Sequence, residues 1–206
     1  CKNSRGRTSL SRIPTKGSSS RRPSLFLTTP DDLTKRRPTK YILRTNFSAS
    51  QPLHVLGDYA AKTLKFRRVA TIALDNGFGH EEAGGFQRVF EDAGGRVVKK
   101  LWPPLTTPDY TPYLAQIGGV DALVQGFAGS NPLKFMKQYR DAGLKLPVLG
   151  GGTACDDALL KSYGDEAVGM ISCSAYTGDL DTPALAPGER VGAVPAQGLQ
   201  AELRQQ

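Results

Sequence analysis

The stretch VATIALDNGFGHEEAGGFQRVF, from Val69 to Phe90, decides the fold class of this chain. A mainly apolar run, Val69 to Leu74, is typical of a buried parallel strand, and it ends at Asp75 and a glycine turn. Apolar residues at helical spacing then predict a helix from His80 to Ala93. A strand that passes through a short turn into a helix is the repeating unit of α/β folds.

The glycine turn in this stretch does not fit a phosphate loop. Gly77 and Gly79 match the first two positions of the dinucleotide pattern G-x-G-x-x-G, but Glu82 stands at the third. Glu81 and Glu82 would repel a pyrophosphate, and we expect them to stabilise the helix N-terminus through its dipole instead. Phe78 lies between the two glycines, at the carboxyl end of a parallel strand, where α/β proteins bind ligands.

Strands and helices continue to alternate along the chain. Before Val69, the pattern predicts a strand at Tyr41–Thr45 and a helix at Leu53–Leu64. After the helix that follows Val69–Leu74, it predicts strands at Arg96–Leu101, Asp121–Gln125, Pro147–Leu149 and Val168–Cys173, and helices at Tyr110–Ile117, Pro132–Ala142 and Asp156–Tyr163. This alternation predicts an α/β, Rossmann-like lobe with about five mainly parallel strands flanked by helices.

The charge of the chain is distributed unevenly along its 206 residues. Residues 1–40 hold eleven Lys or Arg and two Asp, a balance of +9, whereas the remainder holds sixteen basic and seventeen acidic residues. We interpret residues 1–40 as a disordered basic arm, 41–66 as a strand and first helix, 67–180 as the α/β lobe, and 181–206 as a poorly ordered tail. The arm has no interleaved aromatic residues, so we expect no nucleic-acid partner.

The few sulfur and imidazole side chains argue against a metal, a cofactor and an enzyme. Cys1, Cys155 and Cys173 form no CxxC pair, and His54 and His80 stand alone, so we expect no metal ion and no cofactor. A disulfide between Cys155 and Cys173 remains open. Cys155 precedes a predicted helix, where a thiolate is favoured, but neither histidine is placed to act as its base. The sequence shows no signal peptide and no run long enough to span a membrane.

Three stretches stand out by their order and spacing: Asp75 to Gly79, the Thr-x-Asp-Tyr sequence that ends at Asp109-Tyr110, and the helix end Gln138 to Lys145. With the segments around them, from about Thr29 to Pro183, they resemble the branched-chain amino-acid (leucine/isoleucine/valine) periplasmic substrate-binding protein family of ABC transporters. It implies a type I periplasmic-binding-protein fold, in which two α/β lobes joined by crossover strands close on a ligand. This chain resembles mainly the second lobe, with a crossover at Tyr41–Ser50, and the first lobe is largely missing.

The resemblance also implies a function. The chain is expected to be the extracytoplasmic solute-binding component of an ABC importer, either periplasmic or anchored as a lipoprotein. It is expected to trap a small organic ligand by closure of its lobes and then to dock on a membrane permease. Such a protein needs no catalytic group and does not itself span the membrane. Two alternatives stay open: a ligand-sensing domain of a receptor or regulator with the same fold, and an enzyme built on a Rossmann-like lobe.

The candidate ligand site follows from the resemblance and from the parallel sheet, because the carboxyl ends of parallel strands share one edge. The residues expected there are Phe78, Phe127, Ala128, Gly129, Gly152 and Thr153. Three of them have a structural alternative. Phe78 is also suited to covering the sheet edge, Phe127 to the core, and Thr153 to capping the helix that starts near Asp156, itself a good N-cap.

One departure from the family concerns the charge of the ligand. Amino-acid binders of this family commonly place an acidic residue after the fourth strand to hold the ligand's ammonium group. Here that stretch is Gly151-Gly152-Thr153, and the carboxylates of Asp156 and Asp157 lie further along. Because a buried ammonium without a charged partner is costly, apolar or aromatic acids and amides fit this sequence better than amino acids.

Overall fold

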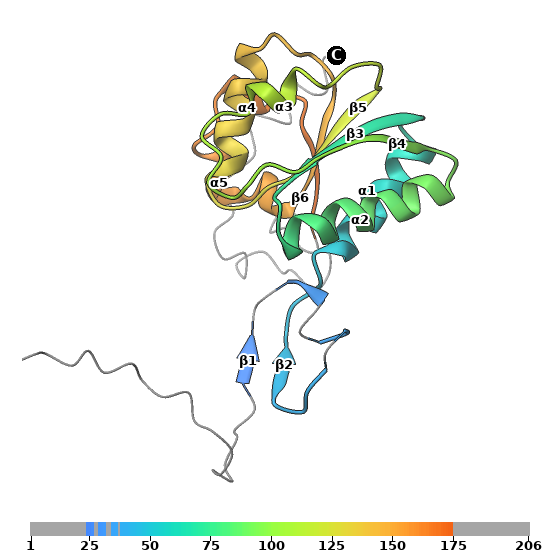
Figure 1. The fold of residues 1–206 in the computed structure, drawn as a ribbon, viewed down its shortest axis with the longest axis vertical. Helices are drawn as coiled ribbons and strands as arrows, with labels where there is room; N and C mark the ends of the chain where they lie inside the picture. The colour runs from blue at the N-terminus through green and yellow to red at the C-terminus, as the bar shows by residue number, and fades with distance from the viewer. Residues whose placement is uncertain (1–23, 27–28, 32–33, 37, 175–206) are drawn as a thin grey trace, which may run out of the picture.

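A five-stranded parallel sheet forms the centre of the protein (Figure 1). The structure, a computed structural model, describes residues 24–26, 29–31, 34–36 and 38–174. The strands are β3 (Arg68–Ala73), β4 (Arg96–Leu101), β5 (Ala122–Gly126), β6 (Val148–Gly151) and β7 (Ile171–Cys173), in the spatial order β4-β3-β5-β6-β7. Every neighbouring pair in this sheet is parallel, which confirms the predicted fold class.

Helices cover both faces of the sheet (Figure 1). On one face, α1 (Ser50–Lys62) and α2 (Gly77–Asp92) pack against the sheet through a cluster that includes Leu53, Phe86 and Phe90. On the other face, α3 (Thr111–Leu114) and α4 (Asn131–Asp141) build a second cluster around Tyr110, Phe127, Phe135 and Tyr139. Successive residues of β5 alternate between the two clusters, as a strand buried on both faces requires.

Two glycines let α1 and α2 approach each other closely. A methyl group at Gly57 of α1 would lie 2.7 Å from the carbonyl oxygen of Phe86, and one at Gly85 of α2 would lie 2.7 Å from that of Ser50. Both distances are shorter than van der Waals contact, so these positions exclude any side chain. The two helices therefore form one rigid layer, which holds the start of α2 in place.

The last part of the sheet is shorter than the sequence predicts. The helix predicted at Asp156–Tyr163 is α5 (Asp157–Leu160), and the last strand begins at Ile171 and not at Val168. Between them lies a 3-10 turn, η3 (Asp165–Ala167), followed by Gly169 with a φ of 82°. A left-handed residue interrupts an extended strand, which explains the late start of β7.

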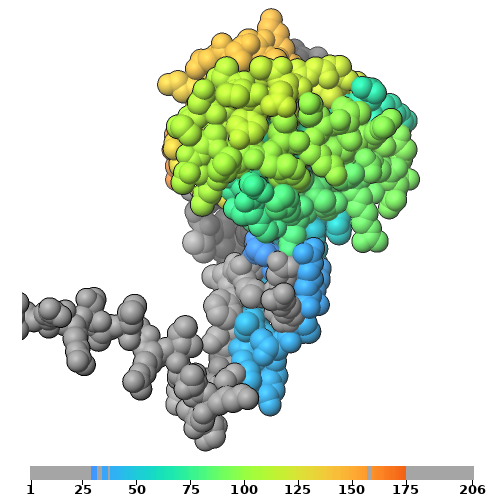
Figure 2. Space-filling model, in the orientation of Figure 1, coloured from blue at the N-terminus to red at the C-terminus, as the bar shows by residue number. Residues whose placement is uncertain are grey.

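The N-terminal arm was predicted to be disordered through residue 40, and this is wrong for part of it. β1 (Ser24–Phe26) pairs in parallel with β2 (Ile42–Arg44), because the short apolar patch near Leu25 gains a strand partner in the predicted crossover. Figure 2 shows the segment around β2, in blue, standing below the rounded lobe. The expectations for residues 1–23 and for the tail at 181–206 lie outside the described residues.

Candidate functional site

Three loops meet at the carboxyl edge of the sheet, where β3, β5 and β6 end. Ala73 at the end of β3 pairs with Gly126 at the end of β5, and the N–H of Leu74 donates to the carbonyl oxygen of Gly126 across 3.1 Å. The hydroxyl group of Thr153, just after β6, donates to the carbonyl oxygen of Phe127 across 2.9 Å. The segments that contain the six predicted residues therefore lie side by side.

Phe78 lies in the first turn of α2 at this edge. The helix begins at Gly77, three residues earlier than predicted, because the side chain of Asn76 accepts the N–H of Gly79 at 3.0 Å and caps the helix. A methyl group at Gly79 would lie 2.2 Å from the carbonyl oxygen of Leu74, so only glycine fits there. The Phe78 side chain is half-buried against the α3–α4 side of the core, which leaves part of the ring at the edge.

The aromatic ring of Phe127 lies in the core and not at the edge. Its side chain is 0 % exposed, with ring centroids 5.2 Å from Tyr110 and 5.0 Å from Phe135. The structure thus places the ring of Phe127 in the core, which was the alternative given for this residue. Its backbone carbonyl group makes the contact with Thr153 in the neighbouring loop. The next two residues reach the surface: Ala128 is half-buried, and Gly129 is exposed with a φ of 66°.

Gly152 and Thr153 open a 3-10 turn, η2 (Gly152–Ala154), directly after β6. Thr153 does not cap α5, because Asp156 does so by accepting the N–H of Leu159 at 2.8 Å. A methyl group at Gly152 would lie 2.9 Å from the hydroxyl oxygen of Ser174. Ser174, which follows β7 at the same edge, is a candidate that the sequence reasoning missed, although its place directly after a predicted strand was a usable signal.

Glu82 does not stabilise the N-terminus of α2 from the solvent, as the sequence reasoning expected. Because the helix starts at Gly77, Glu82 falls in its second turn and points onto the sheet, where it is 4 % exposed. A methyl group at Gly151 would lie within 2.3 Å of its Oε1 atom, and one at Gly126 would lie 3.2 Å from its Oε2 atom. The carboxyl group therefore fills the space that these two glycines leave, directly beneath the candidate site.

Burial dominates the chemistry of the Glu82 carboxyl group. Burial raises its pKa well above the ordinary value, and within the described residues its Oε2 atom has no hydrogen-bond partner. Cys173 lies nearby, and burial, with the Glu82 carboxyl group adding to the effect, raises the pKa of its thiol to about 12. Because burial disfavours its charged form, the Glu82 carboxyl group is a poorer partner for a buried ammonium group than an ordinary carboxylate.

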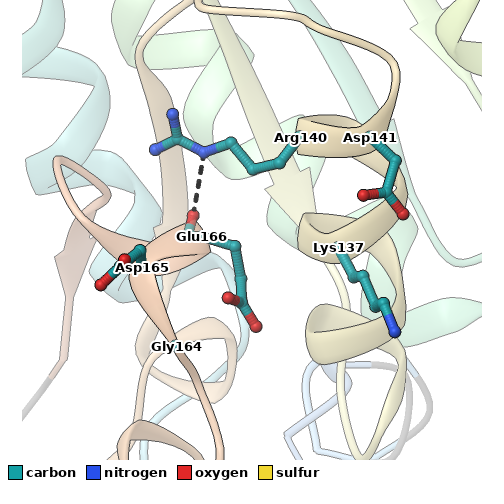
Figure 3. Close-up of a pocket in the computed structure, with 6 residues that line it drawn as sticks. All are labelled: Lys137, Arg140, Asp141, Gly164, Asp165 and Glu166. Atoms are coloured by element: carbon teal, nitrogen blue, oxygen red, sulfur yellow. Dashed lines mark hydrogen bonds between the residues drawn. The ribbon is translucent and has the colours of Figure 1, made fainter.

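A hollow of about 610 Å³ lies away from this edge, between α4 and η3 (Figure 3). It is lined by Lys137, Arg140, Asp141, Gly164, Asp165 and Glu166. Arg140 is held across it, donating to the carbonyl oxygens of Glu166 and Val168 at 3.2 and 2.8 Å. Since α4 ends and β7 begins here, the hollow lies at the amino edge of the sheet, opposite the candidate site.

In the part of the chain that the structure describes, no group of three His, Cys, Asp or Glu side chains is arranged to hold a metal ion. Cys155 and Cys173 are not joined in a disulfide, which decides the pairing that the sequence left open. Among the same residues, no helix is both long and apolar enough to cross a membrane.

Residues 15–190 match a family model described as periplasmic binding protein. The chain belongs to this family. It is 31 % identical over 151 residues to the Leu/Ile/Val-binding protein homolog 6 of Brucella suis, a match that covers 69 % of this chain and 38 % of that protein. The chain thus spans less than half the length of this curated relative, and the resemblance drawn from the sequence is confirmed.

Solved structures of solute-binding proteins share the fold. The solute-binding protein of an ABC transporter from Rhodopseudomonas palustris BisB5, in complex with 3,4-dihydroxybenzoic acid, matches with a TM-score of 0.72 and 30 % identity, covering 80 % of this chain and 46 % of that one. A branched-chain amino-acid ABC transporter protein from Thermus thermophilus with bound valine matches with a TM-score of 0.68 and 23 % identity, covering 80 % and 44 %. At 23 % identity, the second match shows a shared fold only.

Proposed function

We propose that this chain is the ligand-binding lobe of an extracytoplasmic solute-binding protein that delivers a small organic molecule to the permease of an ABC importer. The observation that carries the proposal is the meeting of three loops, after β3, β5 and β6, at one edge of the sheet, in a member of the periplasmic binding protein family. Closure of this edge against a second lobe would trap the ligand. The relatives named above are binding proteins, so the receptor and enzyme alternatives gain no support from them.

The ligand that fits best is an aromatic carboxylic acid. Phe78 offers a half-exposed ring, and the backbone of Ala128, Gly129 and Gly152 lies at the same edge, where N–H groups are suited to bind a carboxylate. In the stretch after β6, where amino-acid binders of this family commonly carry an acidic residue, this chain has Gly152 and Thr153, and burial disfavours the charged form of the nearby Glu82 carboxyl group. Two relatives at 29–30 % identity hold 3,4-dihydroxybenzoic acid and 4-hydroxybenzoate, which supports this class.

A branched-chain amino acid is the second candidate, because the curated relative from Brucella suis carries that name. Its ammonium group would need a charged partner, which a second lobe would have to supply. The two candidate ligands therefore differ in one respect that can be tested: an amino acid carries an ammonium group, and an aromatic acid does not.

The test is an amide NMR titration of the 206-residue chain, once with 4-hydroxybenzoate and once with L-valine. We expect 4-hydroxybenzoate to shift the amide signals of residues 78, 128, 129, 152 and 153, with a dissociation constant on the order of 1 mM, since only one wall of the site is present. A variant at the exposed Val55 of α1, Val55→Ala, serves as the control and should give the same titration. Shifts with valine alone would favour the second candidate, and shifts confined to the α4–η3 hollow would contradict the proposed site.

A further inference from the structure

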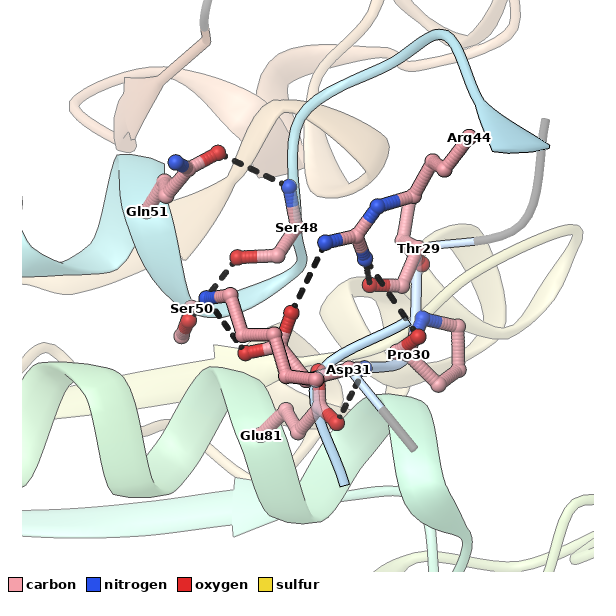
Figure 4. Close-up of polar contacts among 9 residues, drawn as sticks. Thr29, Pro30, Asp31, Arg44, Ser48, Ser50, Gln51 and Glu81 are labelled. Atoms are coloured by element: carbon pink, nitrogen blue, oxygen red, sulfur yellow. Dashed lines mark hydrogen bonds and ion pairs between the residues drawn. The ribbon is translucent and has the colours of Figure 1, made fainter. Parts of the chain in front are cut away.

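Three side chains tie the segments that lead into the lobe to the N-terminal part of α2 (Figure 4). Arg44, the last residue of β2, donates through Nη1 to the carbonyl oxygens of Thr29 and Pro30 at 2.8 and 3.3 Å, and through Nη2 to Oδ1 of Asp31 at 3.0 Å. The backbone N–H of Asp31 in turn donates to Oε1 of Glu81 at 2.5 Å. We call Asp31, Arg44 and Glu81 the latch.

The ion pair between Arg44 and Asp31 is largely shielded from solvent, so breaking it is expected to cost more free energy than breaking an exposed pair. The side chains of Arg44 and Asp31 are 10 % and 15 % exposed. Burial alone would raise the pKa of Asp31, but the hydrogen bonds and charges of Lys35 and Arg44 outweigh it and lower the pKa, so the carboxylate is ionised. Removing Arg44 would take away one of the two cations that hold this carboxylate, together with the donors to the carbonyl oxygens of Thr29 and Pro30. The ion pair with Lys35, whose side chain is 54 % exposed, is open to solvent, and its loss leaves those backbone contacts in place.

The latch also lies against the turn that carries Phe78. Pro30 is the neighbour that a methyl group at Gly77 would meet, at 3.9 Å, and Glu81 follows Phe78 within the first turns of the same helix. On the other side, the N–H of Ala49, just before α1, donates to the carbonyl oxygen of Thr29 at 3.1 Å. Residues 29–31 thus lie between the starts of the two helices, in contact with both.

We propose that the latch joins the connecting segments to the Phe78 turn as one rigid unit, so that Asp31 and Arg44 are positioning residues for the ligand edge. This inference rests on the proposed function, since it concerns how one lobe moves relative to another. When the lobes close, Thr29–Asp31 and Arg44 move with this lobe, and the connection bends on the far side of the latch, toward β1 and the start of β2. Any displacement of these segments is thereby passed to Phe78.

The first experiment measures amide hydrogen exchange in the 206-residue chain without ligand. In Arg44→Ala, exchange should become at least about tenfold faster at Asp31, at Ala49 and in the first turn of α2, because the buried pair is broken. In Lys35→Ala, which removes the exposed partner of the same carboxylate, exchange should stay unchanged. Equal exchange in the two variants would overturn the latch, as would an acceleration in Arg44→Ala that extends equally to the amides of β5.

The second experiment uses the only tryptophan of the chain as a reporter. Trp102 packs against the ring of His80, with centroids 4.1 Å apart, and His80 is next to Glu81 in α2. We expect Arg44→Ala and Glu81→Ala to change the emission of Trp102, Glu81→Gln to restore it by keeping an acceptor oxygen, and Lys35→Ala to leave it as in the wild type. Unchanged emission in both alanine variants would contradict the coupling. Neither experiment needs a ligand, so failure of the latch and failure of the proposed function are separate outcomes.

Discussion

The hydroxyl group of Thr153 donates a hydrogen bond to the carbonyl oxygen of Phe127 across 2.9 Å, although the two residues are 26 positions apart. This bond joins the loop after β6 to the loop after β5 at the point where both leave the sheet. It fixes the neighbouring backbone at Ala128 and Gly152, which lies at the candidate ligand edge. The Thr153 side chain therefore holds the backbone at this edge in place through a hydrogen bond within the protein.

Replacing Thr153 by valine should loosen this edge while keeping the shape of the side chain. We expect a loss of about 0.5–1.5 kcal/mol in the free energy of unfolding, the usual net value of one hydrogen bond. Urea denaturation measures the loss, and Thr106→Val at an exposed position is the matched control, with a change within about 0.5 kcal/mol. A Thr153 variant as stable as the control would show that the bond contributes nothing.

The two phenylalanines of the predicted site should respond differently to truncation. Phe127→Ala removes a fully buried ring from the cluster of Tyr110 and Phe135, so we expect it to destabilise the chain by about 3–5 kcal/mol. Phe78→Ala removes a half-buried ring and should cost distinctly less. Thermal unfolding of both variants beside the wild type tests this order, and the reverse order would contradict the assignment of Phe127 to the core.

The parallel arrangement of the sheet was predictable because strand and helix patterns alternate along the chain. The common edge of the loops after β3, β5 and β6 follows from that topology alone. Side-chain directions were not predictable from it: Phe127 is turned into the core by the two aromatic residues that surround it, Tyr110 and Phe135, which come from elements 17 positions before it and 8 after it.

The position of Glu82 was missed for a local reason. Its direction depends on where α2 begins, and the start is set by the Asn76 cap and by the close approach of Gly79 to Leu74. With a start at His80, Glu82 falls in the first turn, whereas with the start at Gly77 it falls in the second turn, on the same buried face as Phe86 four positions later. The pairing of β1 with β2 was missed because two strands of three residues carry no periodic pattern.

Phe78 should contribute to ligand affinity without being required for folding. In a protein that carries this lobe and a second one, Phe78→Ala should weaken the binding of 4-hydroxybenzoate by about 1–3 kcal/mol, the range of a lost aromatic contact. Calorimetric titration of wild type and variant measures the change, with Val55→Ala as a control on the outer face of α1. Unchanged affinity would make Phe78 a cover of the sheet edge and nothing more.

Glu82 should make the stability of the chain fall as the pH rises. Its pKa is raised in the folded state by burial, above the ordinary value of 4.5. At pH values below this ordinary value, the carboxyl group is protonated in both the folded and the unfolded chain, and its full contribution to stability is present. Above it, the unfolded chain releases the proton first, so stability decreases with pH until the folded-state pKa is passed.

Through this one group, the free energy of unfolding should fall by at most about 1.4 kcal/mol per pH unit. Other ionisable groups add their own slopes, and Asp31 and Asp121, whose pKa values are lowered in the folded state, act in the opposite sense. The diagnostic quantity is therefore the difference between variants. Glu82→Leu removes the ionisable group and with it the buried Oε2 atom, which has no hydrogen-bond partner among the described residues. At neutral pH this substitution should raise the free energy of unfolding by about 1–3 kcal/mol.

Urea denaturation at a series of pH values, from mildly acidic to mildly alkaline, tests the assignment. The stability gained by Glu82→Leu over the wild type should grow with pH, and Glu82→Gln, which keeps the shape but cannot ionise, should show the same growth from a lower starting value. Val55→Ala, which changes an exposed residue of α1 that has no ionisable group, is the control, and its difference from the wild type should not change with pH over this range. A gain in Glu82→Leu that is constant with pH would mean that the carboxyl group is already ionised in the fold, and that a negative charge, suited to a ligand's ammonium group, lies beneath the candidate site after all.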